Sequence, residues 1–134
     1  MHVVAHILVV DDNRDLLAFL KRRLELESHS VATAENGKLA LEAVQEQMPD
    51  LIVLDIMMPV MDGFECNLRL KEDLQTANIP VVMLTAKSET TDKLTALFTG
   101  ACEYITKPFK SEELLEAIHR LLSQETVDPT GEDG

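Results

Sequence analysis

Five short apolar runs, each followed by a longer stretch with helical spacing, constrain the fold of this chain more than any other feature. The runs are residues 7–10, 31–33, 51–54, 81–84 and 104–106. The first, third and fourth are almost continuously hydrophobic, as strands of a parallel sheet are when helices cover both faces. Right-handed crossovers then predict a doubly wound α/β sheet. For five parallel strands with five helices, we expect the flavodoxin-like strand order 2-1-3-4-5.

Three of the stretches between and after these runs carry apolar side chains at helical spacing, which predicts that one face of each helix packs on the sheet. The predicted faces are Leu17, Leu20 and Leu24; Leu41, Val44 and Met48; and Leu114, Ile118, Leu121 and Leu122. Pro49 is expected to end the second helix. Ser111, followed by two acidic residues, is expected to begin the last helix.

The length and composition predict a single domain. A chain of 134 residues fits one core, and its hydrophobic share of 46% is ordinary for a globular protein. We expect residues 5–123 to form this domain. Residues 124–134 contain Pro129, two glycines and almost nothing apolar, so we expect a flexible acidic tail or a truncated linker there.

The charge and cysteine content exclude several classes of function. A formal net charge of −12 should repel nucleic-acid backbones and anionic lipid, so we expect no direct nucleic-acid binding by this segment. Cys66 and Cys102 lie far apart without a zinc-binding pattern and are expected to be small packing residues. No apolar run approaches the roughly 18–20 residues of a membrane-spanning helix, and we expect a soluble, cytoplasmic protein.

Polar side chains stand directly after four of the apolar runs: Asp11 and Asp12 after the first, Asp55 after the third, Thr85 after the fourth and Lys107 after the fifth. The carboxyl ends of parallel strands meet at one edge of the sheet, where doubly wound proteins bind ligands beside the first and third strands. Carboxylates gathered there repel one another unless a cation compensates or one stays protonated. Magnesium, which prefers oxygen ligands, is the expected cofactor.

A carboxylate at this edge is also a potential nucleophile toward phosphorus. We expect Asp55 to fill that role, because it alone follows a fully apolar strand at the centre of the sheet. Lys107 would supply a second cation and Thr85 a hydroxyl donor. Taken singly, these residues have ordinary structural explanations, such as a helix cap, a turn residue or a solvated charge. Their joint placement favours function.

Four segments in order resemble the receiver domains of bacterial two-component response regulators, which share the fold of the chemotaxis regulator. The segments are residues 7–13 (ILVVDDN), 54–63 (LDIMMPVMDG), 81–86 (VVMLTA) and 104–109 (YITKPF). The resemblance spans residues 5 to about 122. It implies a phosphorylation switch that takes its phosphoryl group from a sensor histidine kinase or a histidine phosphotransfer protein. It also implies a downstream output domain or protein as partner, with a homodimer possible on phosphorylation.

The resemblance also assigns roles to the residues of the predicted site. It implies that Asp55 is the phosphoacceptor and that Asp12, Asp55 and the backbone carbonyl of Met57 bind magnesium. Asp11 would orient a metal-bound water. Lys107 would contact the phosphoryl group, and the bond from Lys107 to the following proline is expected to be cis.

The resemblance further implies that Thr85 and Tyr104 form a switch pair, in which the hydroxyl moves toward the phosphate and the ring turns inward. Without it, Tyr104 would be interpreted as a rim aromatic with its hydroxyl in water. Pro59 and Gly63 are interpreted as loop punctuation. As an enzyme, such a domain would catalyse only its own phosphoryl transfer and dephosphorylation.

Two alternatives from other classes stay open. A phosphorylation-independent interaction module with the receiver fold would typically lack Asp55, Lys107 or a member of the acidic pair, and none is missing. A magnesium-dependent phosphatase with an aspartyl nucleophile would want a second carboxylate two residues later, where this chain has Met57.

Overall fold

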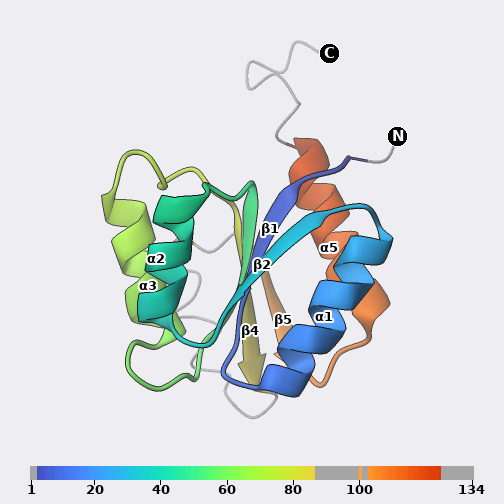
Figure 1. Ribbon diagram of the computed structural model, residues 1–134, viewed down its shortest axis with the longest axis horizontal. Helices are drawn as coiled ribbons and strands as arrows, with labels where there is room; N and C mark the ends of the chain where they lie inside the picture. Colours follow the sequence, from blue (N-terminus) through green and yellow to red (C-terminus); the bar gives the residue numbers. More distant parts are fainter. Residues whose placement is uncertain (1–2, 87–99, 101–102, 125–134) are drawn as a thin grey trace.

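The computed structural model describes residues 3–86, 100 and 103–124 (Figure 1). Five parallel strands form one sheet in the order β2-β1-β3-β4-β5, which confirms the predicted topology. The strands are β1 (His6–Val10), β2 (Ser30–Ala34), β3 (Leu51–Asp55), β4 (Val81–Ala86) and β5 (Glu103–Lys107).

Three of the strands extend past their apolar runs and include the polar residues that were expected to follow them. Asp55 is the last residue of β3 and pairs with Leu84, while Lys107 is the last residue of β5 and pairs with Ala86. Thr85 likewise lies within β4. Backbone pairing does not depend on side-chain polarity, so the hydrophobic runs underestimate the strand ends. The site residues are thereby fixed by the sheet.

Four helices are described: α1 (Arg14–Leu26), α2 (Gly37–Glu46), α3 (Gly63–Glu72) and α5 (Ser111–Gln124). The predicted helix between β4 and β5 lies outside the described residues, as do Cys102 and the predicted tail from residue 125 onward. The helix α5 begins at Ser111 as expected and continues through Gln124, one residue beyond the predicted end of the domain. No helix in the described part of the chain is long and apolar enough to cross a bilayer.

Side-chain caps begin three of the helices near the carboxyl edge of the sheet. The side chains of Asn13, Asn36 and Asp62 accept hydrogen bonds from backbone N–H groups three residues later, at 2.9–3.1 Å. Such caps satisfy N–H groups that lack an intrahelical partner. They therefore define where α1, α2 and α3 start relative to the strand ends.

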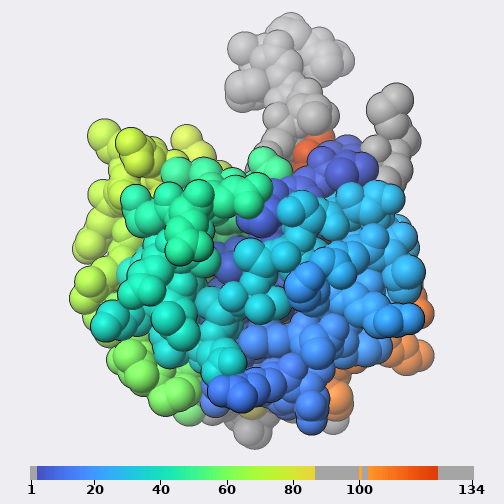
Figure 2. All heavy atoms as spheres, in the orientation of Figure 1, coloured from blue at the N-terminus to red at the C-terminus, as the bar shows by residue number. Residues whose placement is uncertain are grey.

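The core is divided by the sheet into two apolar layers. The helices α1 and α5 pack with Ile7, Val9 and Val53 on one face, whereas α2 and α3 pack with Leu8 and Leu54 on the other. Figure 1 shows these two helix pairs on opposite sides of the strands. In the space-filling view of Figure 2, side chains of α1, β2 and α2 fill most of one face of the molecule.

Burial confirms the predicted faces of α1 and α5, whose named leucines and isoleucine are all buried. The face predicted for α2 is partly wrong. Val44 is buried, but Met48 is 44% exposed because α2 ends at Glu46, before Met48 could continue the helical face. Cys66 of α3 is fully buried, which confirms its packing role, and burial raises the pKa of its thiol to about 12.

Candidate functional site

Three aspartates meet at the carboxyl edge of the sheet, as the sequence predicts. Asp11, Asp12 and Asp55 each offer a carboxylate oxygen, and these oxygens all lie within 4.8 Å of one another. They converge because β1 and β3 are neighbours, paired through Val10 and Leu54. Asp11 is fully buried and Asp55 is 5% exposed, whereas Asp12 is exposed. The cluster thus has a buried floor and one carboxylate at its mouth.

Lys107 reaches this cluster from β5, on the far side of β4. Its Nζ lies 2.8 Å from Oδ2 of Asp11 and 3.2 Å from Oδ1 of Asp55. Burial by itself would lower the pKa of Lys107, but the hydrogen bond to Asp11 and the charges of Asp55 and Asp11 outweigh burial and raise it. The lysine is therefore a stable cation that bridges two carboxylates. The expected cis peptide between Lys107 and Pro108 is also confirmed.

The carboxyl group of Asp55 is the most perturbed acid of the site. Burial, followed by the negative charge of Asp11, raises its pKa from 3.8 to about 6, and the nearby Lys107 only partly offsets these effects. The protein thus holds Asp55 in a setting that penalises its charge when no further cation is present. A bound divalent cation would remove this penalty.

A pH-dependent stability follows for the metal-free protein. Between pH 3.8 and about 6, folded Asp55 retains a proton that the unfolded chain has released, so the free energy of unfolding falls as the pH rises through this window. At pH 7 the charged form costs up to about 3 kcal/mol. Asp55→Asn removes the titration and should stabilise the protein by about 1–3 kcal/mol at pH 7, and by almost nothing near pH 4. Urea unfolding in a chelator measures this, and an equal gain at both pH values would contradict it.

The donor set fits magnesium. Hard divalent cations take carboxylate and carbonyl oxygens, and magnesium is typically held by one or two carboxylates while it keeps several waters. Asp12 and Asp55 would hold the ion, with Asp11 beside them. Met57, whose backbone carbonyl was expected as a further ligand, stands two residues after Asp55 with a 59% exposed side chain. The side chain of Met57 is therefore not packed in the core.

Thr85 lies beside this cluster on β4. It is 1% exposed, and it follows Leu84, the residue that pairs with Asp55. Its hydroxyl donates a long hydrogen bond of 3.4 Å to the carbonyl of Ala86. A bond of this length is weak. The hydroxyl can therefore exchange it for a stronger acceptor at low cost.

Tyr104 lies on β5, where it pairs with Met83, and its ring packs in part against the α2 and α3 layer of the core. Thr85 pairs with Thr106, two residues after Tyr104. Because side chains alternate along a strand, Thr85 and Tyr104 lie on the same face of the sheet on adjacent strands. The proposed switch pair therefore lies on one face of the sheet, on two neighbouring strands.

Gly63 has a stricter role than loop punctuation. It is the first residue of α3, and a Cβ built there would lie 2.3 Å from the carbonyl oxygen of Asp55 and 2.8 Å from Cα of Ile56. Its N–H donates to the carbonyl of Ile56 at 2.8 Å. The start of α3 therefore lies directly against the backbone of Asp55 and Ile56. Only the close approach itself, which is invisible in the sequence, reveals this requirement.

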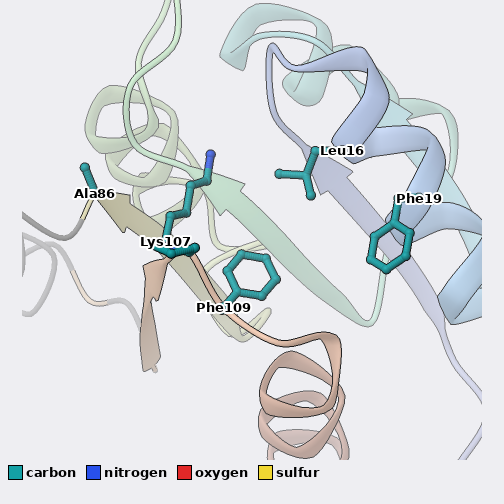
Figure 3. A pocket seen from close by; sticks show the side chains of 6 residues that line it. Leu16, Phe19, Ala86, Lys107 and Phe109 are labelled. Carbon is teal, nitrogen blue, oxygen red and sulfur yellow. The ribbon is translucent and has the colours of Figure 1, made fainter.

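An apolar groove of about 390 Å³ opens next to Lys107, and no motif in the sequence predicts it (Figure 3). Leu16 and the 53% exposed Phe19 line it from α1, and Pro108 and Phe109 line it from the segment after β5. In Figure 3 the ring of Phe109 lies between Lys107 and the ring of Phe19. An exposed phenylalanine on an otherwise regular amphipathic helix is the one sequence signal that points to this groove.

Comparison with known proteins agrees with this geometry. The family described as response regulator receiver domain matches residues 7–119. Protein PilH of Pseudomonas aeruginosa is 38% identical over 120 residues, which are 90% of this chain and 99% of PilH. Histidine kinase P4 of Formosa agariphila is 42% identical over 116 residues, or 87% of this chain.

The chain spans only 8% of the length of histidine kinase P4, and about half the length of several transcriptional regulators that it matches, among them PhoP of Bacillus subtilis. Among solved structures, chemotaxis response regulator CheY4 of Vibrio cholerae superposes with a TM-score of 0.82 at 32% identity, covering 88% of this chain and 98% of CheY4. The fold, the aspartate cluster and these matches agree, and the chain belongs to the family of response regulator receiver domains.

Proposed function

We propose that this domain is a phosphorylation-dependent switch, in which Asp55 accepts a phosphoryl group from a phosphohistidine in a magnesium-dependent reaction. The observation that carries the proposal is the bridge of Lys107 to Asp11 and Asp55 beside the exposed Asp12. It gathers a buried nucleophile, a fixed cation and a solvent-facing carboxylate at one strand end.

The proposed transfer needs little from the protein except position and charge. An oxygen of Asp55 attacks phosphorus while the bond from phosphorus to the donor imidazole nitrogen breaks, and that nitrogen keeps the bonding pair. Lys107, already 3.2 Å from Oδ1 of Asp55, is placed to neutralise charge on the phosphoryl oxygens. Magnesium held by Asp12 and Asp55 would supply further charge neutralisation. Water later attacks phosphorus and restores the carboxylate.

The donor would be a sensor histidine kinase or a histidine phosphotransfer protein. In support, the groove between Phe19 and Phe109 offers exposed apolar surface next to Lys107, where a partner must approach to reach Asp55. The net charge of −12 disfavours contact with nucleic acid, so an output such as transcriptional control would belong to another segment or another protein.

The direct test is incubation with magnesium and a small acyl-phosphate donor, followed by intact-mass measurement and peptide mapping. With magnesium, we expect the mass of one phosphoryl group to be added at Asp55. When a chelator replaces magnesium in the incubation, we expect no such adduct to form. Absence of the adduct under both conditions would overturn the proposal and favour an interaction module that does not use phosphorylation.

Removing the hydroxyl of Thr85 should uncouple phosphorylation from the surface change at Tyr104. A hydrogen bond from Thr85 to a charged phosphoryl oxygen is worth about 1.5–3 kcal/mol, so Thr85→Ala should lower the ratio of switched to unswitched protein about tenfold or more. Phosphoryl incorporation should persist. NMR shifts of the β5 amides, recorded with and without the acyl-phosphate donor, measure the ratio.

The matched control is Thr33→Ala, which removes an exposed hydroxyl near the end of β2, at the opposite edge of the sheet. It should leave the response of β5 unchanged. A Thr85→Ala protein whose β5 amides shift as fully as those of the wild type would exclude the proposed coupling.

A further inference from the structure

The loop between β3 and α3 contains a strained turn centred on Val60. Val60 has φ of +71°, and the N–H of Met61 donates to the carbonyl of Pro59 at 2.7 Å. A hydrogen bond between residues two apart around a positive φ defines the rare, strained form of the γ-turn. A β-branched residue is among the least suited to this backbone region. Val60 is also 76% exposed, so its own burial does not compensate the strain.

Hydrogen bonds on both sides hold this turn. The carbonyl of Met61 accepts from the N–H of Gly37 at 3.1 Å, which ties the turn to the start of α2. The N–H of Gly63 donates to Ile56 at 2.8 Å, and a Cβ at Gly37 would lie only 2.7 Å from the carbonyl oxygen of Met61. Strain of this kind persists only where surrounding contacts impose it. These contacts stabilise the positive φ of Val60, whereas the intrinsic preference of a β-branched residue for negative φ opposes it.

The turn lies directly between two parts of the proposed site. Asp55 and Met57 precede it, and Gly63, which rests on the carbonyl of Asp55, follows it. If the turn opens, the backbone between Met57 and Gly63 must change its path. The position of the Met57 carbonyl, the proposed backbone ligand, consequently depends on whether Val60 stays at positive φ.

We propose that Val60 is a positioning residue that weakens magnesium binding, because its strain depopulates the loop conformation that binds the ion. This proposal rests on the magnesium site proposed above. When only a fraction of the protein is binding-competent, the apparent dissociation constant rises in inverse proportion to that fraction. A residue that tolerates positive φ at position 60 would increase the population of the binding-competent conformation and so lower the apparent dissociation constant.

The test compares Val60→Gly and Val60→Asn with the wild type by calorimetric titration of the full chain with magnesium chloride. Both residues accept positive φ, so both should lower the dissociation constant. The gain is limited to the inverse of the binding-competent fraction in the wild type, and it cannot exceed about five- to thirtyfold, the factor equivalent to the usual cost of this conformation. Val60→Ala retains a Cβ and should give a much smaller gain. Val4→Asn, at another exposed valine, should bind like the wild type.

A metal-free readout accompanies the titration. Amide signals of residues 57, 58, 61 and 62 should show exchange between two conformations in the wild type, and a single sharp set in Val60→Gly. Equal magnesium affinity in the wild type and both variants, with unchanged amide signals, would overturn the role of Val60 and leave the metal site intact. Absence of binding in every protein, including the wild type, would instead overturn the magnesium site itself and this proposal with it.

Discussion

Replacing Asp55 with alanine is expected to reduce magnesium-dependent phosphoryl incorporation to about a hundredth of the wild-type level or less, because the substitution deletes the nucleophile. Asp11 and Asp12 stay within the same cluster but should not replace it. Asp11 is fully buried and its carboxylate already accepts hydrogen bonds from the N–H of Asn13 and from Lys107. Its oxygens therefore cannot turn toward an incoming phosphorus without breaking these contacts.

Incorporation is measured as the phosphorylated fraction in intact-mass spectra after reaction with an acyl-phosphate donor. Asp15→Asn, which removes an exposed carboxylate from the first turn of α1, is the matched control and should react like the wild type. The Asp55→Asn protein tests charge at nearly constant size and should be as unreactive as Asp55→Ala. Full incorporation in either Asp55 variant would show that another residue accepts the phosphoryl group.

Gly63→Ala should lower the free energy of unfolding by about 3 kcal/mol or more, at the upper end of what overpacking costs. The added methyl group would meet backbone atoms of Asp55 and Ile56, at 2.3 Å and 2.8 Å, and neither can move without displacing β3. In an unobstructed helix the same change would be favourable by roughly 0.5–1 kcal/mol. A loss of stability, rather than a gain, would therefore show that the added methyl group overlaps the backbone of Asp55 and Ile56.

Urea unfolding of the wild type and Gly63→Ala measures this loss. Gly100→Ala serves as a control for backbone strain without steric overlap. Gly100 has φ of +86°, unlike Gly63, and the nearest obstacle to a Cβ there is a flexible lysine side chain at 3.6 Å. Strain alone should cost this control about 1 kcal/mol. A Gly63→Ala protein as stable as the wild type would mean that α3 does not approach β3 as closely as described.

Much of the fold is predictable because parallel strands buried on both faces must be hydrophobic almost throughout. The apolar runs that contain Val9, Val53 and Val82 predict three strands, and these three side chains are completely buried. The alternation with helices then favours a doubly wound sheet with the order 2-1-3-4-5, which the structure has. The aspartate cluster follows from that order, because Asp11 directly follows β1 and Asp55 ends β3, the neighbouring strand.

The remaining features depend on contacts between segments that the sequence does not relate. The sequence does not distinguish Gly63 from an ordinary loop glycine, because its role depends on how closely α3 packs against β3. Met48 has the spacing of a core residue, but α2 ends before it and leaves it exposed. The groove arises only when α1 lies beside the segment after β5. The bridge from Lys107 to both Asp11 and Asp55 likewise depends on the reach of a flexible side chain across β4.

The ion pair between Lys107 and Asp11 joins residues 96 positions apart, with a consequence for how the chain is completed during synthesis. The ribosome produces all three aspartates well before it produces the lysine. Until β5 emerges, a nascent sheet of β1, β2 and β3 would gather like charges without their internal counter-ion. Repulsion among the carboxylates thereby disfavours folding of that fragment on its own. When β5 is added, Lys107 neutralises part of this negative charge. The N-terminal and C-terminal halves should therefore fold together.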